Sequence, residues 1–350
     1  MILPGSPAAV LILLILGMLC WGLWANTYKA VGEKWRFELY YFDFAIGVLL
    51  TGALVAMTLG SLGFDGFSFA DDLQLAGKRQ DAFGFVGGMI FNLGNMLLLG
   101  AVSVSGMAVA FPMAMGMALV FGTFWTYILN PGGNPVLLFI GVAVVFASVV
   151  VAILAFRIQA TAQRMASVQQ GKAKSTKKKI SSKAVILSLF GGLLIGSSPP
   201  LIQMARAGEN GLGPYSVGFI FAIGIFFSTF VFNLFFMNLP IQGEPIDLGV
   251  YFKAKMKRHA AGFASGIVWY VGLAGGLVGS RIDGAAKAPP SFIYVMGQAG
   301  TFIAALCGIL IWKEFEGADP RAKTYLVLML VLLAIGIGLA STGSFIPPNS

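Results

Sequence analysis

The sequence predicts an all-α integral membrane protein with ten transmembrane helices, arranged as two inverted five-helix repeats. Three observations predict this class: a composition unlike that of soluble domains, ten apolar runs of membrane-spanning length, and an internal repeat. Of the 350 residues, 57% are apolar and only 11% are charged, and the mean hydropathy is +0.85. Soluble domains carry about 25% charged residues. A soluble enzyme is therefore excluded.

The spans follow from the length of the apolar runs. A helix needs about 20 apolar residues to cross the hydrocarbon core. The first run has no basic residue before it, so we expect a span and not a signal peptide. We expect segment 63–82 to be an interfacial loop or a short amphipathic piece. The ten predicted spans are 8–28, 42–62, 83–101, 106–128, 135–156, 184–205, 214–237, 260–280, 290–312 and 323–342.

The positions of Lys and Arg predict the orientation. If both termini face outside, the five inner loops hold 18 of the 23 basic residues, and basic loops face the cytoplasm. The basic segment 157–183, with Lys172, Lys174 and Lys177 to Lys179, is then a cytoplasmic linker. It separates a first repeat, 1–156, from a second, 184–350.

An internal repeat appears at an offset of 178 residues. Each copy contains five spans, an odd number, so the second copy must enter the membrane in the opposite direction. Inverted repeats are typical of secondary transporters. The matches are Gly84, Phe85, Gly88 and Gly94 with Gly262, Phe263, Gly266 and Gly272, then Gly106 with Gly284, Pro112 with Pro290, and Gly122-Thr123-Phe124 with Gly300-Thr301-Phe302.

Polar side chains inside the spans mark the candidate substrate site. A polar group at membrane depth is costly unless it faces a cavity or a partner. Amides donate and accept hydrogen bonds at once, as a neutral polar ligand requires, and aromatic faces suit a sugar or a flat heterocycle. A bond between two helices is the alternative for a lone amide. The candidates are Trp21, Asn26, Asn92, Asn95, Trp269, Tyr270, Tyr294 and Gln298.

Prolines and acidic residues supply the candidates for hinges and for proton coupling. We expect hinges at Pro112 and Pro290 and a helix break, or only a kink, at Pro199 and Pro200, because proline removes a backbone donor. No acidic residue lies at the centre of a span. The coupling candidates are Asp43, Glu38 and Glu314, with Asp43 first because it lies inside span 2. A boundary ion pair with Lys313 is the alternative for Glu314.

The sequence offers little for catalysis. It has one histidine, His259, in a basic loop, and two cysteines, Cys20 and Cys307, inside apolar runs. A histidine zinc site or a Ser-His-Asp triad inside the membrane is therefore excluded. We expect no enzyme activity, no cofactor and no metal. The net charge is +9, and the basic residues cluster beside the spans. This placement favours a role in membrane orientation over nucleic-acid binding.

A family resemblance rests on four stretches. They are Lys29 to Trp35, Phe91-Asn92-Leu93-Gly94-Asn95, Gly122-Thr123-Phe124 and Lys313-Glu314-Phe315. In them the chain resembles the drug/metabolite transporter superfamily, specifically its glucose/rhamnose branch with the bacterial rhamnose–proton symporters, and has the plant ureide permeases as relatives. The resemblance implies a 5+5 inverted repeat, a central cavity lined by spans 1, 3, 4, 6, 8 and 9, and a small polar substrate, most often a sugar.

These observations together predict a secondary-active transporter of the inner membrane that works by alternating access. Monosaccharide uptake, with protons as a possible second substrate, is the main expectation. A ureide or nucleobase permease, or a metabolite exporter, is the alternative. We expect membrane lipid and a small metabolite as the partners and no nucleic acid. The exact substrate, the direction of transport, the coupling ion and the oligomeric state are left open.

Overall fold

The computed structural model describes residues 1–350 except 33–34, 64–66, 170–181, 281–288 and 347–350. All regular elements of the described residues are helical, and ten helical segments there are long and apolar enough to cross a membrane. The predicted all-α membrane fold with ten spans is confirmed, and the inverted repeat stays a prediction. These spans are Pro7–Val31, Phe37–Met57, Lys78–Ser105, Met107–Leu129, Pro135–Ala162, Ser182–Ala205, Pro214–Asn238, Met256–Gly279, Pro290–Ile311 and Pro320–Phe345.

Two of the spans are divided. The first consists of α1 (Pro7–Leu23) and α2 (Asn26–Val31), and the ninth of α12 (Pro290–Gln298), α13 (Gly300–Leu306) and a π-helical turn, η1 (Cys307–Ile311). The continuous spans are α3 (Phe37–Met57), α5 (Lys78–Ser105), α6 (Met107–Leu129), α7 (Pro135–Gln169), α8 (Ser182–Ala205), α9 (Pro214–Asn238), α11 (Met256–Gly279) and α14 (Pro320–Phe345). Two short helices, α4 (Phe69–Leu75) and α10 (Gly249–Phe252), lie between spans.

The prolines do not divide the helices where the sequence predicted. α8 continues through Pro199 and Pro200, so the predicted helix break there is wrong, and the alternative of a kink stays a prediction. Pro290 occupies the first turn of α12, where the missing N–H of proline costs no hydrogen bond. Pro112 lies inside α6, as predicted. The break that the structure does contain follows Gln298, between α12 and α13.

Two helices extend into predicted loops. α7 continues to Gln169, well into the predicted linker, while Lys172, Lys174 and the lysines 177–179 lie outside the described residues. α11 begins at Met256. His259 therefore lies on the first turn of a spanning helix and not in a loop.

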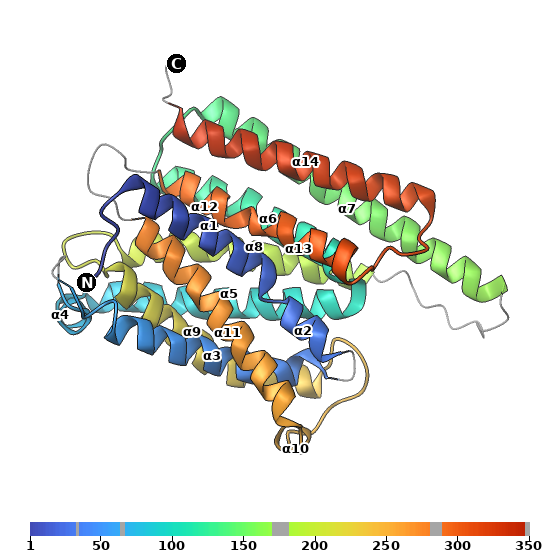
Figure 1. Ribbon diagram of the computed structural model, residues 1–350, viewed down its shortest axis with the longest axis horizontal. Helices are drawn as coiled ribbons and strands as arrows, with labels where there is room; N and C mark the ends of the chain where they lie inside the picture. Colours follow the sequence, from blue (N-terminus) through green and yellow to red (C-terminus); the bar gives the residue numbers. More distant parts are fainter. Residues whose placement is uncertain (33–34, 64–66, 170–181, 281–288, 347–350) are drawn as a thin grey trace.

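The spans run alternately up and down one bundle, and both termini lie at the same end of it (Figure 1). α7 and α14 pack together along one side of this bundle (Figure 1). The other spans surround the centre, where the candidate site lies. We call the end with the termini the terminal end and the other the loop end.

Two helix crossings in the bundle repeat each other. α3 packs on α11, and α9 packs on α5. Where α3 and α11 cross, Gly47 approaches Gly266, and a Cβ atom on Gly266 would come within 2.2 Å of a backbone oxygen of α3. Where α9 and α5 cross, Gly224 approaches Gly88, and a Cβ atom on Gly88 would come within 2.1 Å of a backbone oxygen of α9. The same contact thus recurs in the second half of the chain, because Gly224 follows Gly47 by 177 residues and Gly266 follows Gly88 by 178.

Candidate functional site

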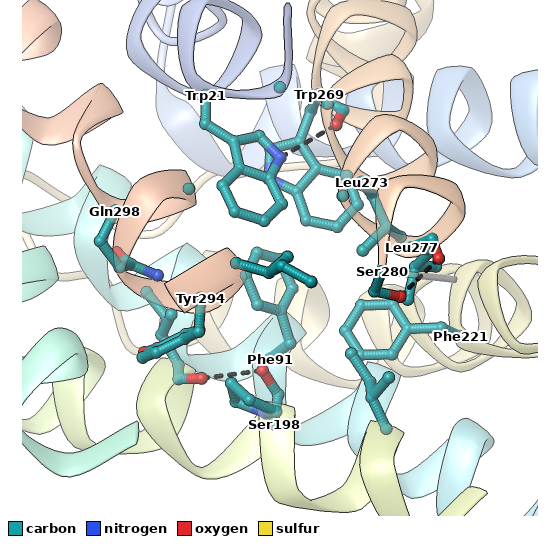
Figure 2. Close-up of a pocket in the computed structure, with 18 of the residues that line it drawn as sticks. Trp21, Phe91, Ser198, Phe221, Trp269, Leu273, Leu277, Ser280, Tyr294 and Gln298 are labelled. Atoms are coloured by element: carbon teal, nitrogen blue, oxygen red, sulfur yellow. Dashed lines mark hydrogen bonds between the residues drawn. The ribbon is translucent and has the colours of Figure 1, made fainter. Parts of the chain in front are cut away.

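A cavity of about 160 Å³ lies at the centre of the bundle, among α1, α5, α6, α8, α9, α11 and α12 (Figure 2). Trp24 and Leu98 line its central part. Arg206, Ser280 and Pro290 line it where α8 and α11 end and α12 begins. Those helix termini belong to the terminal end of the bundle. The cavity therefore reaches from the centre of the spans to the terminal end.

Aromatic rings form much of the cavity surface. The Trp269 ring lies 4.7 Å from the Phe91 ring, centroid to centroid, and 6.4 Å from the nearly parallel Phe221 ring. The Trp21 indole nitrogen donates a hydrogen bond of 3.3 Å to the Trp269 carbonyl oxygen, which fixes the two tryptophans side by side. Flat apolar faces of this kind suit a flat ligand.

A few polar groups interrupt this apolar surface. The Asn95 amide donates to the Tyr41 hydroxyl at 3.0 Å, and the Tyr294 hydroxyl donates to the Ala118 carbonyl oxygen at 2.7 Å. Gln298 lines the cavity with its carbonyl oxygen unpartnered among the described residues. An apolar cavity with a small number of placed polar groups is typical of a small-molecule site.

The structure brings five of the eight predicted binding residues to this cavity. Asn26 and Tyr270 lie elsewhere. The Asn26 carbonyl oxygen accepts a hydrogen bond of 2.7 Å from the Trp312 indole, and Tyr270 is buried against Gly52 and Gly218. The five that line the cavity are Trp21, Asn95, Trp269, Tyr294 and Gln298.

Asn92, the remaining candidate, is fully buried and is absent from the cavity lining. Its amide nitrogen donates to three oxygens of α9, which belong to Ile225, Ser228 and Thr229, at 2.8–3.1 Å. The alternative of a bond between two helices therefore describes Asn92 in this structure. Its neighbour on the next turn, Asn95, faces the cavity instead.

Sequence reasoning missed several cavity residues. Phe91 and Phe221 were overlooked because phenylalanine is common throughout the spans. Arg206, which donates a hydrogen bond to the Ser280 hydroxyl, was also overlooked. One signal was available, since Arg206 is one of the few basic residues outside the predicted inner loops. That signal identifies it as unusual without assigning a role.

All three coupling candidates lie at the loop end, away from the cavity opening. The Asp43 carboxylate of α3 lies 3.0 Å from the His259 ring nitrogen of α11. It also accepts a hydrogen bond of 2.7 Å from the Tyr251 hydroxyl of α10. Burial, followed by the hydrogen bond to Asp43 and the negative charge of Asp43, raises the pKa of Tyr251 above its usual value.

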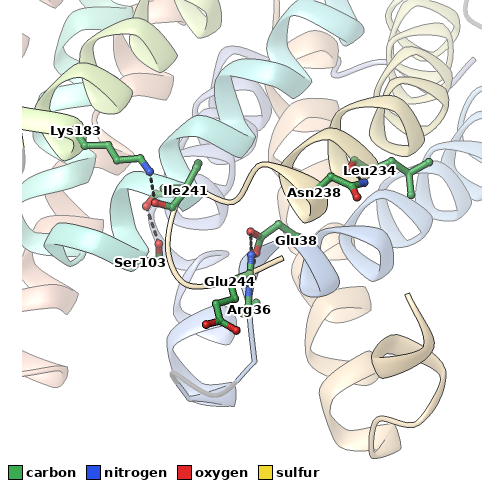
Figure 3. Close-up of polar contacts among 9 residues, drawn as sticks. Arg36, Glu38, Ser103, Lys183, Leu234, Asn238, Ile241 and Glu244 are labelled. Atoms are coloured by element: carbon green, nitrogen blue, oxygen red, sulfur yellow. Dashed lines mark hydrogen bonds and ion pairs between the residues drawn. The ribbon is translucent and has the colours of Figure 1, made fainter. Parts of the chain in front are cut away.

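Glu38 and its neighbours hold the loop that follows α9. Glu38 pairs with Arg36 at 2.5 Å, and the Arg36 guanidinium also donates to the Glu244 carbonyl oxygen (Figure 3). The Lys183 ammonium donates to the Ile241 carbonyl oxygen of the same loop (Figure 3). These contacts join the loop to the start of α3 and the start of α8.

Glu314 joins the ninth span to the first half of the chain. Its carboxylate lies 2.8 Å from the Lys29 ammonium and accepts backbone N–H bonds from Met107 and Ala108, at the start of α6. Glu314 thus forms a boundary ion pair with Lys29 and not with Lys313, which lies 3.7 Å from Glu316.

The comparisons with known proteins agree with a transporter. The family model described as ureide permease matches residues 40–190. The chain is similar to ureide permeases. Ureide permease 1 of Arabidopsis thaliana is 23% identical to it, with 97% of this chain and 98% of that protein aligned. Ureide permease 2 of the same plant is 22% identical, with 98% and 99% aligned.

A solved crystal structure shares the fold. It superposes with a TM-score of 0.55 at 12% identity, covering 97% of this chain and 99% of that one. The ureide permeases were among the relatives that the sequence motifs indicated, and this part of the resemblance is confirmed. Spans, cavity and relatives together support a multi-pass membrane transporter of a small polar metabolite.

Proposed function

We propose that the protein is a permease for a small nitrogenous metabolite of the ureide or cyclic-amide class, and that the central cavity binds it. The observation that carries this proposal is the pair of tryptophans, Trp21 and Trp269, beside the amides of Asn95 and Gln298 in one cavity. A ureide presents N–H and C=O groups next to each other, which an amide can pair with both ways. Its flat part suits the aromatic faces.

The relatives favour this substrate class over a sugar. Those with full-length alignments are named ureide permeases. Monosaccharide uptake, the main expectation from the sequence, has no such support. Sugars therefore serve as the alternative in the experiment below.

Alternating access is the mechanism that we propose. The cavity reaches one end of the bundle, and the Glu314–Lys29 ion pair and the Asp43–His259 contact join the two halves at the other. The repeated glycine crossings support an inverted repeat of 1–156 and 184–350. Together with the basic loops, they favour a cell-membrane protein with the terminal end outside and the linker 157–183 in the cytoplasm. The structure then corresponds to an outward-facing state.

Asp43 is the coupling residue that we propose for proton-driven uptake. Glu38 pairs with an arginine and Glu314 with a lysine. The partners of Asp43 are instead a histidine ring and the Tyr251 hydroxyl. The contact with the histidine also joins α3 of the first half to α11 of the second, so a change of its charge acts on both halves.

Counterflow in proteoliposomes tests the proposal. Labelled allantoin, uracil and L-rhamnose are compared, with and without an inward proton gradient. We expect exchange of allantoin or uracil, loss of exchange in Trp269→Ala, and normal exchange in Ile12→Ala, whose side chain is exposed on α1. Exchange of rhamnose alone would replace the ureide class with a sugar. No exchange of any of the three by folded protein contradicts the proposal.

A further inference from the structure

The break in the ninth span lies against the cavity. α12 ends at Gln298, and the Ala299 N–H bonds the Met296 carbonyl oxygen, three residues back and not four. α1 approaches the break closely. A Cβ atom on Gly297 would come within 2.6 Å of the Trp21 ring, and one on Gly300 within 2.6 Å of the Met18 carbonyl oxygen. Discontinuous helices beside a midplane cavity are typical binding elements of transporters.

Gln298 carries an unpartnered side-chain oxygen at this break. Its side chain lines the cavity, and the residue is only 3% exposed. The carbonyl oxygen has no hydrogen-bond partner among the described residues. Leaving a buried amide oxygen unpaired is costly. A group that enters the cavity and donates a hydrogen bond would remove this cost.

The other amides near the cavity are held by protein contacts or lie outside its lining. The Asn95 nitrogen donates to Tyr41, and the Asn92 nitrogen donates to α9. The carbonyl oxygen of Asn92 is also unpartnered among the described residues, but Asn92 lies outside the cavity lining. The carbonyl oxygen of Gln203, in the lining, accepts a hydrogen bond of 2.6 Å from Asn130. Gln298 therefore combines a place in the cavity lining with a buried side-chain oxygen that is unpartnered among the described residues.

We propose that Gln298 determines specificity by pairing with the –NH–C(=O)– edge of a planar nitrogenous ring. This inference rests on the proposed function. Figure 2 shows Gln298 beside Trp21, on the opposite side of the cavity from Phe221. A ring that stacks on the tryptophans can direct its edge to Gln298. The carbonyl oxygen of Gln298 accepts the ring N–H, and its amide nitrogen donates to the ring C=O.

The choice of ligand follows from this pairing. Methylating the ring nitrogen removes the donor and leaves the Gln298 oxygen unpaired and buried. A site built to bond a donor rejects an analogue that lacks it. Wild-type protein should therefore prefer uracil over 1,3-dimethyluracil, roughly tenfold for each lost hydrogen bond.

The experiment measures how well unlabelled uracil and 1,3-dimethyluracil inhibit counterflow of labelled allantoin. In Gln298→Leu we expect the preference for uracil to disappear, because inhibition by uracil becomes weaker and inhibition by the methylated ring does not. Gln298→Glu keeps an acceptor and removes the amide donor, so it should weaken the binding of both ligands, which share the ring C=O, and keep the preference for uracil. Gln159→Leu is the matched control, since Gln159 is a buried glutamine of α7 with an unpartnered oxygen outside the cavity lining.

The outcomes separate the two proposals. If wild-type protein shows no allantoin or uracil exchange, the proposed function fails and the inference fails with it. If wild-type protein exchanges them but Gln298→Leu keeps the preference for uracil, only the role of Gln298 is overturned. A Gln298→Leu variant that loses both ligands equally would indicate a purely structural residue. If that variant does not fold, Gln298→Glu decides, and unchanged inhibition by both ligands in Gln298→Glu would overturn the role of Gln298.

Discussion

The Glu314 carboxylate lies 2.8 Å from the Lys29 ammonium and also accepts two backbone N–H bonds at the start of α6. Glu314 follows the ninth span, whereas Lys29 and α6 belong to the first half of the chain. A carboxylate at a helix N-terminus is stabilised by the backbone N–H groups and the helix dipole. Glu314 therefore joins the two halves at the loop end, on the opposite side from the cavity opening.

Replacing this carboxylate should weaken the junction. In Glu314→Gln we expect the stability to fall by about 1–3 kcal/mol, because charge-assisted hydrogen bonds are lost. The measurement is the midpoint of thermal unfolding in detergent. Glu316→Gln is the control, since its pair with Lys313 is exposed and exposed pairs contribute little. Equal midpoints for the two variants would show that Glu314 does not hold the halves together.

Tyr251 should make the stability depend on alkaline pH. Its folded-state pKa lies above its ordinary value of 10.0, so the folded protein keeps this proton while the unfolded chain loses it. The stabilisation is then fully present below pH 10 and is lost as the pH rises through the folded pKa. In Tyr251→Phe we expect a lower unfolding midpoint at pH 8 and a smaller further loss between pH 9 and 11.

The control for that comparison is Tyr325→Phe on α14, which should follow the wild-type curve. The measurement is the unfolding midpoint of each variant across the pH series. If wild-type protein and Tyr251→Phe decline in parallel above pH 9, the hydrogen bond from Tyr251 to Asp43 does not contribute to the pH dependence.

Asp43→Asn should separate exchange from accumulation. The variant keeps the size of the side chain and can still accept from Tyr251, so we expect counterflow to continue. Accumulation driven by an inward proton gradient should be lost, because the amide cannot take up a proton. Glu38→Gln, which alters the other buried acid of α3, should keep gradient-driven accumulation. If Asp43→Asn still accumulates substrate, Asp43 is not the coupling residue.

The sequence predicted the number and order of the spans because apolar length and the placement of basic residues are local properties. It predicted the Trp21 and Trp269 side chains in the cavity because large polar-tipped aromatics are conspicuous inside apolar runs. Helix breaks were predicted less well. Pro199 and Pro200 remain within α8, whereas the break follows Gln298, where α1 presses on Gly297 and Gly300. That contact is tertiary and leaves no local signal.

The partners of the polar residues were not predictable from the sequence. Asn92 and Asn95 lie one turn apart and are identical in type, yet one bonds α9 and the other lines the cavity. The partner of Asp43, His259, is 216 residues away. Only the packing of α3 on α11 brings the two together.

Asn92 and Asn95 should therefore respond differently to the same substitution. Asn92→Leu removes three buried hydrogen bonds to α9, and we expect a loss of stability of about 1–3 kcal/mol from the loss of these bonds. Asn95→Leu removes one bond and an amide of the cavity, so its main effect should be on counterflow. Unfolding midpoints and counterflow rates of both variants check this. If Asn92→Leu is as stable as wild-type protein but has lost counterflow, Asn92 contributes to substrate binding and not to stability.

The two glycine crossings provide a test of the repeat that needs no substrate. A Cβ atom on Gly88 would lie 2.1 Å from the Phe221 carbonyl oxygen, and one on Gly266 would lie 2.2 Å from the Phe44 carbonyl oxygen. A backbone oxygen cannot turn aside as a side chain can, so the helices must separate. In Gly88→Ala and Gly266→Ala we expect similar losses of about 1–3 kcal/mol, as for overpacked cores.

Gly338→Ala on α14 is the matched control, because no atom lies within 4 Å of its added Cβ. It should leave the unfolding midpoint unchanged or raise it slightly, since alanine favours the helix. Small residues allow close helix contact in lipid, and the proposed inverted repeat would make the two crossings equivalent. Clearly unequal losses at Gly88 and Gly266 would mean that the halves do not depend on these crossings in the same way. Equal losses would support two structurally equivalent halves.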